Sequence, residues 1–218
     1  MMLELSPKGK SLVDMYTQMA NCGYDRHDGK RVETAFSDFE SRKIKEHIKK
    51  IFNKHSVASI LDYGCGGSDW YAPGFDSATG MSAVDYYQIE CALRYEPARS
   101  LDDRAVNAAD CVISFDVLEH VFISDVPKVI EDMFINARAI LILNVACYPA
   151  SARLPNGENA HITVRPPIWW KGQVDSIASR HPDITVYLGC SQSYGQIGFF
   201  SPFGETIWQQ SASFETAC

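Results

Sequence analysis

The sequence predicts an α/β protein with a doubly wound, mostly parallel sheet, and two observations support this fold class. Strand-like apolar runs alternate with helical segments between residues 37 and 146, as they do where crossover helices join parallel strands. Residues 57–66 form an apolar run that ends on Asp62 and turns at once through two glycines. Because glycine permits positive φ angles and close backbone approach, this turn predicts a ligand at the carboxyl end of a buried strand.

Size and composition predict a single cytoplasmic domain. The chain has 218 residues, of which 46% are hydrophobic and 22% charged, and this is enough for one substantial core. It has no apolar run of about 18 residues, and its first residues lack the charged-then-apolar layout of a secretion signal. We therefore expect a cytoplasmic protein without membrane association.

Charge and cysteine usage argue against several functions. The net charge is −7, and basic residues outnumber acidic ones only in residues 1–55, by 11 to 8, against 9 to 19 in the rest. General nucleic-acid binding is not expected, although a local basic patch stays open. The seven cysteines form no CxxC pair, and several lie in apolar runs where Cys acts as a small hydrophobe. We expect no disulfide framework and no metal site.

The first predicted elements are a helix over 37–54 and a strand over 57–62. Ser37 and Glu40 have the spacing of a capping box at the start of the helix. Its apolar face carries Ile44, Ile48, Ile51 and Phe52.

The next region is less regular. Proline and glycine interrupt residues 67–88, although 81–89 can form a short helix. A second strand is expected over 91–96, closed by Pro97, which cannot donate to a strand ladder.

Three further elements follow. They are a strand over 110–116, a helix over 124–137 with Pro127 in its first turn, and an almost wholly apolar strand over 139–146.

The C-terminal part has a different sequence pattern. A loop over 148–159 leads to a helix over 167–179 and a strand over 184–188. The tail from Gly195 is aromatic and β-prone around 202–204, and we expect a closing antiparallel strand or hairpin there.

Acidic side chains close three of the predicted strands. These are Asp62, Glu96 and Asp116, and ligands in open α/β sheets bind outside the carboxyl ends of strands. Glu96, after the second strand, is well placed to accept both hydroxyls of a ribose. As an alternative, Asp62 and Asp116 are helix or turn caps.

The glycine turn does not fit the dinucleotide fingerprint. Counting from Gly64, a third glycine of G-x-G-x-x-G would fall at Asp69. Because an acid there would repel a pyrophosphate, we expect a nucleoside-like cofactor without phosphates.

Three motifs resemble those of the class I S-adenosylmethionine-dependent methyltransferases. Residues 61–66 match hydrophobic-Asp-x-Gly-x-Gly, and residues 115–120 match the D-V-L-E-H segment after the fourth strand. Residues 95–97 look like the Y-D-P motif of a bacterial and phage subgroup that acts on small molecules or glycans. The resemblance covers residues 36–147, about half of the chain.

This resemblance implies a Rossmann-like fold with S-adenosyl-L-methionine as the cofactor. Its methionine and ribose portions would lie against the turn after the first strand, and Glu96 would take the ribose hydroxyls. Asp116 would lie on the methionine or sulfonium side. The implied cofactor-binding residues are Asp62, Tyr63, Gly64, Cys65, Gly66, Glu96, Asp116, Val117 and Leu118.

The same resemblance divides the single domain 1–218 into parts. Residues 1–36 are expected as an N-terminal lid or helical segment, 37–147 as the cofactor-binding core, and 148–218 as acceptor-side loops, a helix and closing strands. Within the N-terminal segment, Tyr16, Tyr24 and His27 are candidates for the lid, with disorder or simple packing as the alternative.

The spacing departs from the family in two places. Asp62 and Glu96 are 34 positions apart, which requires an insertion. Only about a dozen residues separate Glu96 from Asp110, so the third-strand region is shortened. The turn at 101–103 is the expected place for adenine.

Two histidines are candidate catalytic residues, because histidine can remove a proton from a hydroxyl acceptor near neutral pH. His161 follows a glycine-containing loop beyond the strand 139–146, and His120 lies in the D-V-L-E-H segment. As alternatives, His161 packs the loop, His120 stays beside the cofactor and Glu119 is a helix-entry acid. Trp169 and Trp170 form either an aromatic acceptor wall or part of the core.

We therefore expect an S-adenosylmethionine-dependent methyltransferase that O-methylates a small molecule or a sugar or glycan precursor. The motif (Asp/Asn)-Pro-Pro-(Tyr/Phe) is absent, which disfavours methylation of DNA-base amino groups. The alternative is a non-catalytic regulatory or interaction protein that binds S-adenosylmethionine or S-adenosylhomocysteine.

Overall fold

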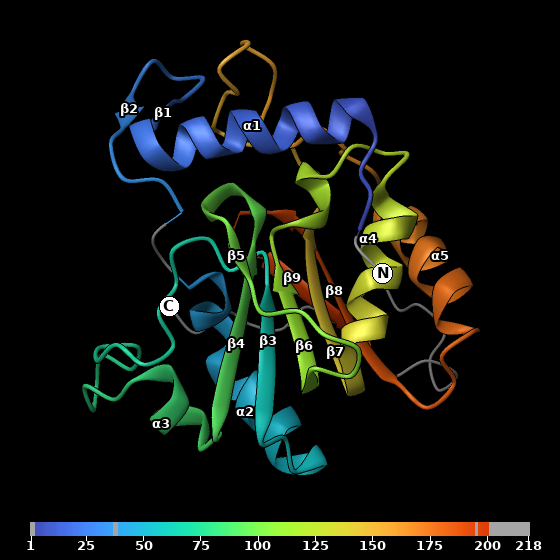
Figure 1. The fold of residues 1–218 in the computed structure, drawn as a ribbon. Helices are drawn as coiled ribbons and strands as arrows, with labels where there is room; N and C mark the ends of the chain where they lie inside the picture. Colours follow the sequence, from blue (N-terminus) through green and yellow to red (C-terminus); the bar gives the residue numbers. More distant parts are fainter. Residues whose placement is uncertain (1–2, 37–38, 195, 201–218) are drawn as a thin grey trace.

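The computed structural model describes residues 3–36, 39–194 and 196–200, with side chains described up to residue 194. A seven-stranded sheet forms its centre, in the order β5-β4-β3-β6-β7-β8-β9 (Figure 1). The strands are β3 (Ser59–Tyr63), β4 (Cys91–Glu96), β5 (Leu101–Asp102), β6 (Ala109–Phe115), β7 (Ala137–Ala146), β8 (Thr185–Ser193) and β9 (Gln196–Phe200). The five inner strands pair in parallel, whereas β5 and β9 at the edges are antiparallel. This arrangement confirms the α/β class and is compatible with a Rossmann-like fold.

Helices cover both faces of the sheet and divide the core into two layers. Adjacent residues of β3 point to opposite faces, so Ile60 packs in one layer and Leu61 in the other. The Ile60 layer is covered by α2 (Lys45–His55) and α3 (Ala83–Tyr87), and the Leu61 layer by α4 (Val126–Asn136) and α5 (Pro167–Ala178).

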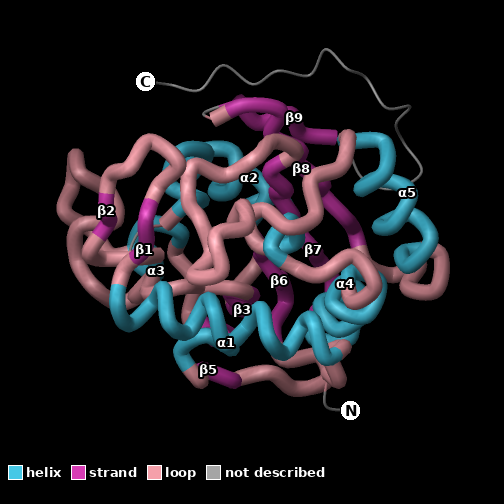
Figure 2. The backbone as a smooth tube through the Cα atoms, turned by 90° about the horizontal axis from the view of Figure 1, so that it is seen from above, coloured by secondary structure: helices cyan, strands magenta, loops and turns pink. Residues whose placement is uncertain are grey.

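The N-terminal segment crosses the sheet at one end. Helix α1 (Pro7–Cys22) lies above the strands, followed by a two-stranded ribbon of β1 (Tyr24–Asp25) and β2 (Arg31–Val32) (Figure 2). Ser6 caps α1 by accepting from the Gly9 amide, and its hydroxyl donates to buried Asp125 at the start of α4 over 2.5 Å. This pair fixes α1 over the carboxyl ends of the central strands.

The first predicted helix begins later than the sequence indicated. A 3₁₀ turn over Glu40–Ile44 precedes α2, which starts at Lys45, and Phe39 at the head of that turn offers no side-chain cap. Ser37, the other half of the expected capping box, lies outside the described residues.

The shortened third-strand region is confirmed. A 3₁₀ turn over Pro97–Arg99 follows β4, and the two-residue strand β5 then pairs with β4 in the antiparallel sense. No helix fits between β5 and β6, because the chain already enters β6 at Ala109.

The antiparallel closing strand is also confirmed, with different bounds. Strand β8 extends to Ser193, five residues beyond the predicted end, and β9 pairs with it in the antiparallel sense. The segment 202–204, where the closing strand or hairpin was expected, lies outside the described residues. Among the helices that the structure describes, none is long and apolar enough to cross a membrane.

Candidate ligand-binding site

A cavity of about 480 Å³ opens where the carboxyl ends of β3, β4 and β6 meet, beneath α1. The chain leaves β3 to form β4 on one side and later crosses to β6 on the other, so this is the topological switch point of the sheet. The volume lies within the range of about 300–1,000 Å³ that is typical of small-molecule pockets.

Nearly all of the residues expected in the site line this cavity. They are Asp62, Tyr63, Gly64, Cys65, Gly66, Glu96, Asp116, Val117, His120 and His161. The expectation was wrong for Leu118, which is buried in the core with α4 because an apolar side chain gains most there. Tyr63 contributes only in part, since its hydroxyl donates to buried Asp132 over 2.7 Å.

The two glycines of the turn after β3 are required by the packing of the protein, independently of any ligand. Gly64 has a φ of +83°, and a Cβ there would lie 2.3 Å from Cγ2 of Val117. Gly66 has a φ of +55°, and its Cβ would lie 2.8 Å from the carbonyl oxygen of Phe36. The turn thus packs against Val117, which follows β6, and against Phe36 of the N-terminal segment, in addition to bordering the cavity.

Glu96 holds the turn after β3 to the turn after β4. Its Oε2 accepts from the amide of Gly66 over 2.9 Å, and its Oε1 accepts from the amide of Ala98 over 3.0 Å. Burial raises the pKa of this carboxyl, although both amide hydrogen bonds oppose the shift. Each oxygen retains a second lone pair for a hydroxyl of a ligand.

Asp62 supports the long insertion after the β3 turn. Its Oδ2 accepts from the Ser68 hydroxyl over 3.0 Å and from the Trp70 indole over 2.8 Å, while Oδ1 accepts no hydrogen bond from the described residues. Burial raises its pKa to about 6. One oxygen of Asp62 thus holds the insertion in place, and the other, Oδ1, is available to accept a hydrogen bond from a ligand.

Asp116 follows β6 in a left-handed conformation. Its φ is +55°, which an aspartate tolerates better than most residues, and its Oδ1 accepts from the side-chain amide of Asn144 on β7 over 2.8 Å. Burial, followed by the nearby charge of Glu40, raises its pKa to about 6.

The described lining of the cavity is acidic. It contains the carboxyl groups of Glu40, Asp62, Glu96 and Asp116, and no lysine or arginine. Such a lining opposes ligands that carry phosphates and favours ligands that carry positive charge.

His120 is held as a neutral imidazole. Its Nδ1 lies 2.9 Å from the carbonyl oxygen of Ala160, which can only accept, so Nδ1 carries the proton and Nε2 a lone pair. The Tyr16 hydroxyl donates to the same carbonyl over 2.5 Å. Burial, then the neighbouring His161, lowers the pKa of His120 to about 3.

His161 is held in the same way by the loop after β7. Its Nδ1 lies 2.5 Å from the carbonyl oxygen of Tyr148, and its Nε2 lies 3.9 Å from Oε1 of Glu119. The rings of His161 and His120 meet edge to face, with centroids 4.9 Å apart. Burial lowers the pKa of His161.

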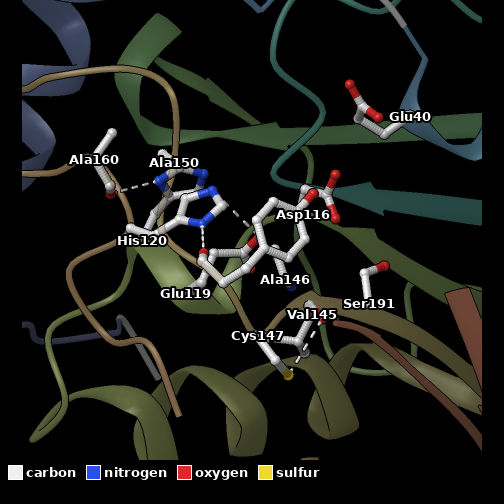
Figure 3. A network of polar contacts seen from close by, with 12 residues as sticks. Glu40, Asp116, Glu119, His120, Val145, Ala146, Cys147, Ala150, Ala160 and Ser191 are labelled. Carbon is white, nitrogen blue, oxygen red and sulfur yellow. Dashed lines mark hydrogen bonds and ion pairs between the residues drawn. The ribbon is translucent and has the colours of Figure 1, made fainter. Parts of the chain in front are cut away.

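Glu119 lies in the first turn of the 3₁₀ helix Leu118–His120, so the alternative of a helix-entry acid holds for its position in the chain. Its side chain is 0% exposed, and its Oε1 accepts from the Ala146 amide over 3.2 Å. Glu119 and His120 lie together in Figure 3, with Ala160 on one side and Asp116 on the other. Burial, followed by the charge of Asp116, raises the pKa of Glu119 well above its usual range.

The structure decides between the two alternatives for the tryptophans, and it shows that one expectation, for the turn 101–103, was wrong. Trp169 and Trp170 pack into the core on the α5 side and do not line the cavity, so the core alternative holds for them. The turn 101–103 does not line it either, because residues 101–102 pair with β4; Pro97 and Ala98 border the cavity instead.

The N-terminal segment roofs the cavity, as expected for Tyr16 and Tyr24, which both line it. His27 does not line it, because its ring contacts Arg153 and Asn159 on the surface. The sequence analysis missed Leu12 and Phe36, which also line the roof. An apolar stripe along 5–19 was the signal that could have revealed the contribution of this helix.

Fold and site together define an α/β protein with an acidic cavity at the switch point of its sheet. No protein-family model matches the sequence. A search of curated proteins found no significant match.

Proposed function

We propose that this protein is an S-adenosylmethionine-dependent methyltransferase that O-methylates a small molecule or a sugar or glycan precursor. The observation that carries the proposal is the acidic lining of the cavity at the carboxyl ends of β3, β4 and β6. S-adenosylmethionine carries a positive sulfonium and an ammonium group and no phosphate, so its charge is complementary to this lining.

The residues present fit this cofactor. Glu96 has lone pairs free at the end of β4, in the position that suits ribose hydroxyls, and its two backbone partners fix its orientation. Oδ1 of Asp62 and the carboxylate of Asp116 can accept from the ammonium group. When bound, the cofactor supplies a methyl group already activated for transfer.

The acceptor side of the proposal depends on the two histidines. Both line the cavity, and both donate Nδ1–H to a carbonyl oxygen, so their Nε2 lone pairs are available. At neutral pH both rings are unprotonated, since burial lowers both pKa values. His161 can thus accept the proton of an acceptor hydroxyl, whereas the lower pKa of His120 makes it the weaker base.

Calorimetry with S-adenosylmethionine and S-adenosylhomocysteine tests the shared premise. We expect saturable 1:1 binding of both, and no heat from either with folded protein would end the proposal. Binding without methyl transfer to a broad panel of hydroxyl compounds would instead favour a non-catalytic cofactor-binding protein.

Two substitutions test the division of labour. Glu96→Ala should weaken cofactor binding about tenfold or more, because it removes charge-assisted hydrogen bonds. His161→Ala should leave cofactor affinity unchanged and lower turnover. Glu90→Ala is the control, since Glu90 is exposed at the opposite end of β4. Equal loss of cofactor binding in the Glu96 and His161 variants would contradict this assignment.

A further inference from the structure

Three potential ligand side chains converge on one wall of the cavity. One ligand atom each from Glu119, His120 and His161 lies within 4.8 Å of the other two. They come from two separate segments, the turn after β6 and the loop after β7, which the parallel pairing of these strands brings together. It is the one such group of three among the residues that the structure describes.

Both imidazoles are oriented by backbone carbonyls. Nδ1 of His120 donates to Ala160, and Nδ1 of His161 donates to Tyr148. Neither Nε2 has a hydrogen-bond partner among the described residues. A ring whose one nitrogen donates to a carbonyl, so that the other nitrogen offers its lone pair, has the arrangement of a metal-binding histidine.

Glu119 supplies an independent observation. Its side chain is 0% exposed, and Oε2 has no hydrogen-bond partner. A buried carboxyl oxygen without a partner costs several kcal/mol if it is charged, so native structures normally provide a partner or a cation. Apart from the Ala146 amide, which donates to Oε1, the two imidazoles lie close to the carboxyl with their Nε2 lone pairs free, and these lone pairs cannot donate to it.

We propose that Glu119, His120 and His161 bind a divalent first-row transition-metal ion on the wall of the cavity. Two imidazoles and one carboxylate are a donor set that such ions accept, with further coordination positions left for ligands from the cavity. Metal–ligand bonds of about 2.1 Å at tetrahedral angles place ligand atoms about 3.4 Å apart. The 3.9 Å between Nε2 of His161 and Oε1 of Glu119 needs to close by about 0.5 Å, and the other ligand atoms, which lie within 4.8 Å of one another, need to close by up to about 1.4 Å.

This site does not depend on the methyl transfer proposed above. If both proposals are true, the Nε2 lone pair of His161 binds the ion and is not available to accept a proton. An acceptor hydroxyl would then meet the bound ion in place of the free imidazole. The site also revises the expectation of no metal, which was based on cysteine spacing; the adjacent Glu119-His120 pair was the signal in the sequence.

Titration of the chelator-treated protein with Mn²⁺ and, separately, with Co²⁺ tests this proposal. The electron paramagnetic resonance signal of free Mn²⁺ should be lost on binding, and Co²⁺ should gain visible d–d absorption. Both changes should saturate at one ion per chain. Glu119→Gln keeps the shape of the side chain and the acceptor for the Ala146 amide, so it should fold and yet bind the ions at least about tenfold more weakly. His161→Ala should have a similar effect.

His55→Ala is the matched control, because His55 bonds to Tyr187 on the far side of the sheet and should not affect ion binding. Binding of neither ion to the folded wild-type chain would overturn the proposal. Binding of equal strength in the Glu119 and His161 variants would also overturn it. Cofactor calorimetry without metal is measured separately, so failure of one proposal does not decide the other.

Discussion

At the scale of single residues, the residues of the turn after β3 both border the cavity and hold the turn in its conformation. Gly64 and Gly66 have positive φ angles, and protein atoms occupy the space where a Cβ would lie. Glu96 and Asp62 then use their oxygens to hold this turn and the insertion that follows it. The residues that border the cavity are thus the same ones that fix its shape.

Gly64→Ala should destabilise the protein by more than its backbone angle alone explains. Gly157 has a similar φ, +87°, but no atom lies within 4 Å of where its Cβ would be. Gly157→Ala therefore measures the loss of unfolding free energy that the positive φ alone causes, about 1–2 kcal/mol. The clash with Val117 adds to this for Gly64. Urea denaturation should show the larger loss for Gly64→Ala, and the double variant Gly64→Ala/Val117→Ala should recover part of it. Equal losses for the two glycines would contradict the clash.

Asp62→Asn should stabilise the unliganded protein increasingly as pH rises. Burial raises the pKa of Asp62 from 3.8 to about 6, so between these values the native state binds a proton that the unfolded state does not. Its contribution to the unfolding free energy therefore falls as pH rises through this window, by about 3 kcal/mol in total. Asn removes that loss and keeps an oxygen for Ser68 and Trp70. A difference from wild type that is constant between pH 4 and pH 7 in denaturation experiments would contradict this.

At the scale of elements, α1 is joined to the body of the protein by a small apolar cluster around Leu12 and Met19 and by a few polar bonds. Ser6 and Asp125 fix its start, and the Tyr16 hydroxyl donates to Ala160. Since α1 roofs the cavity, its local stability controls access to the cavity.

Ser6→Ala should loosen α1 selectively. It removes the helix cap and the bond to Asp125, which together contribute about 1 kcal/mol or more. Hydrogen exchange of amides in 7–22 should accelerate about fivefold or more, while amides of β6 and β7 should be unaffected. Thr17→Ala is the control, because the Thr17 hydroxyl bonds only to Val13 in the same helix. Uniform acceleration across the whole protein would contradict a local role.

At the scale of the whole molecule, the sheet concentrates acidic side chains at one point. Three of the four acids of the described cavity lining lie at or next to the carboxyl ends of β3, β4 and β6, and the net charge of the chain is −7. The acidic character of the cavity is thus a property of the assembled sheet.

Thermal unfolding should report the effect of this acidic character on ligand binding. S-adenosylmethionine at about 100 times its Kd should raise the unfolding free energy by about 2.7 kcal/mol, and the Tm of a chain of this size by about 5–10 °C. ATP and NAD at the same concentration should cause no measurable rise, because the acidic lining repels their phosphates. A larger shift with either nucleotide would contradict the charge argument.

Much of the fold could be predicted because local patterns determine it. The strand 91–96 has the predicted bounds, and the short spacing between Glu96 and Asp110 indicated the reduced third-strand region. The errors fell where local signals are weak: the first helix begins at Lys45, and β8 continues to Ser193 through polar residues that pairing with β9 supports.

The sequence by itself determined the α/β class and the acids at the strand ends, since both follow from short-range periodicity and from residues next to one another in the chain. Only the tertiary structure decided the roof formed by α1, the burial of Trp170 and Leu118, and the meeting of Glu119 and His120 with His161. These depend on contacts between segments about 40 or more residues apart, which form when the parallel strands align their carboxyl ends and which no local pattern encodes.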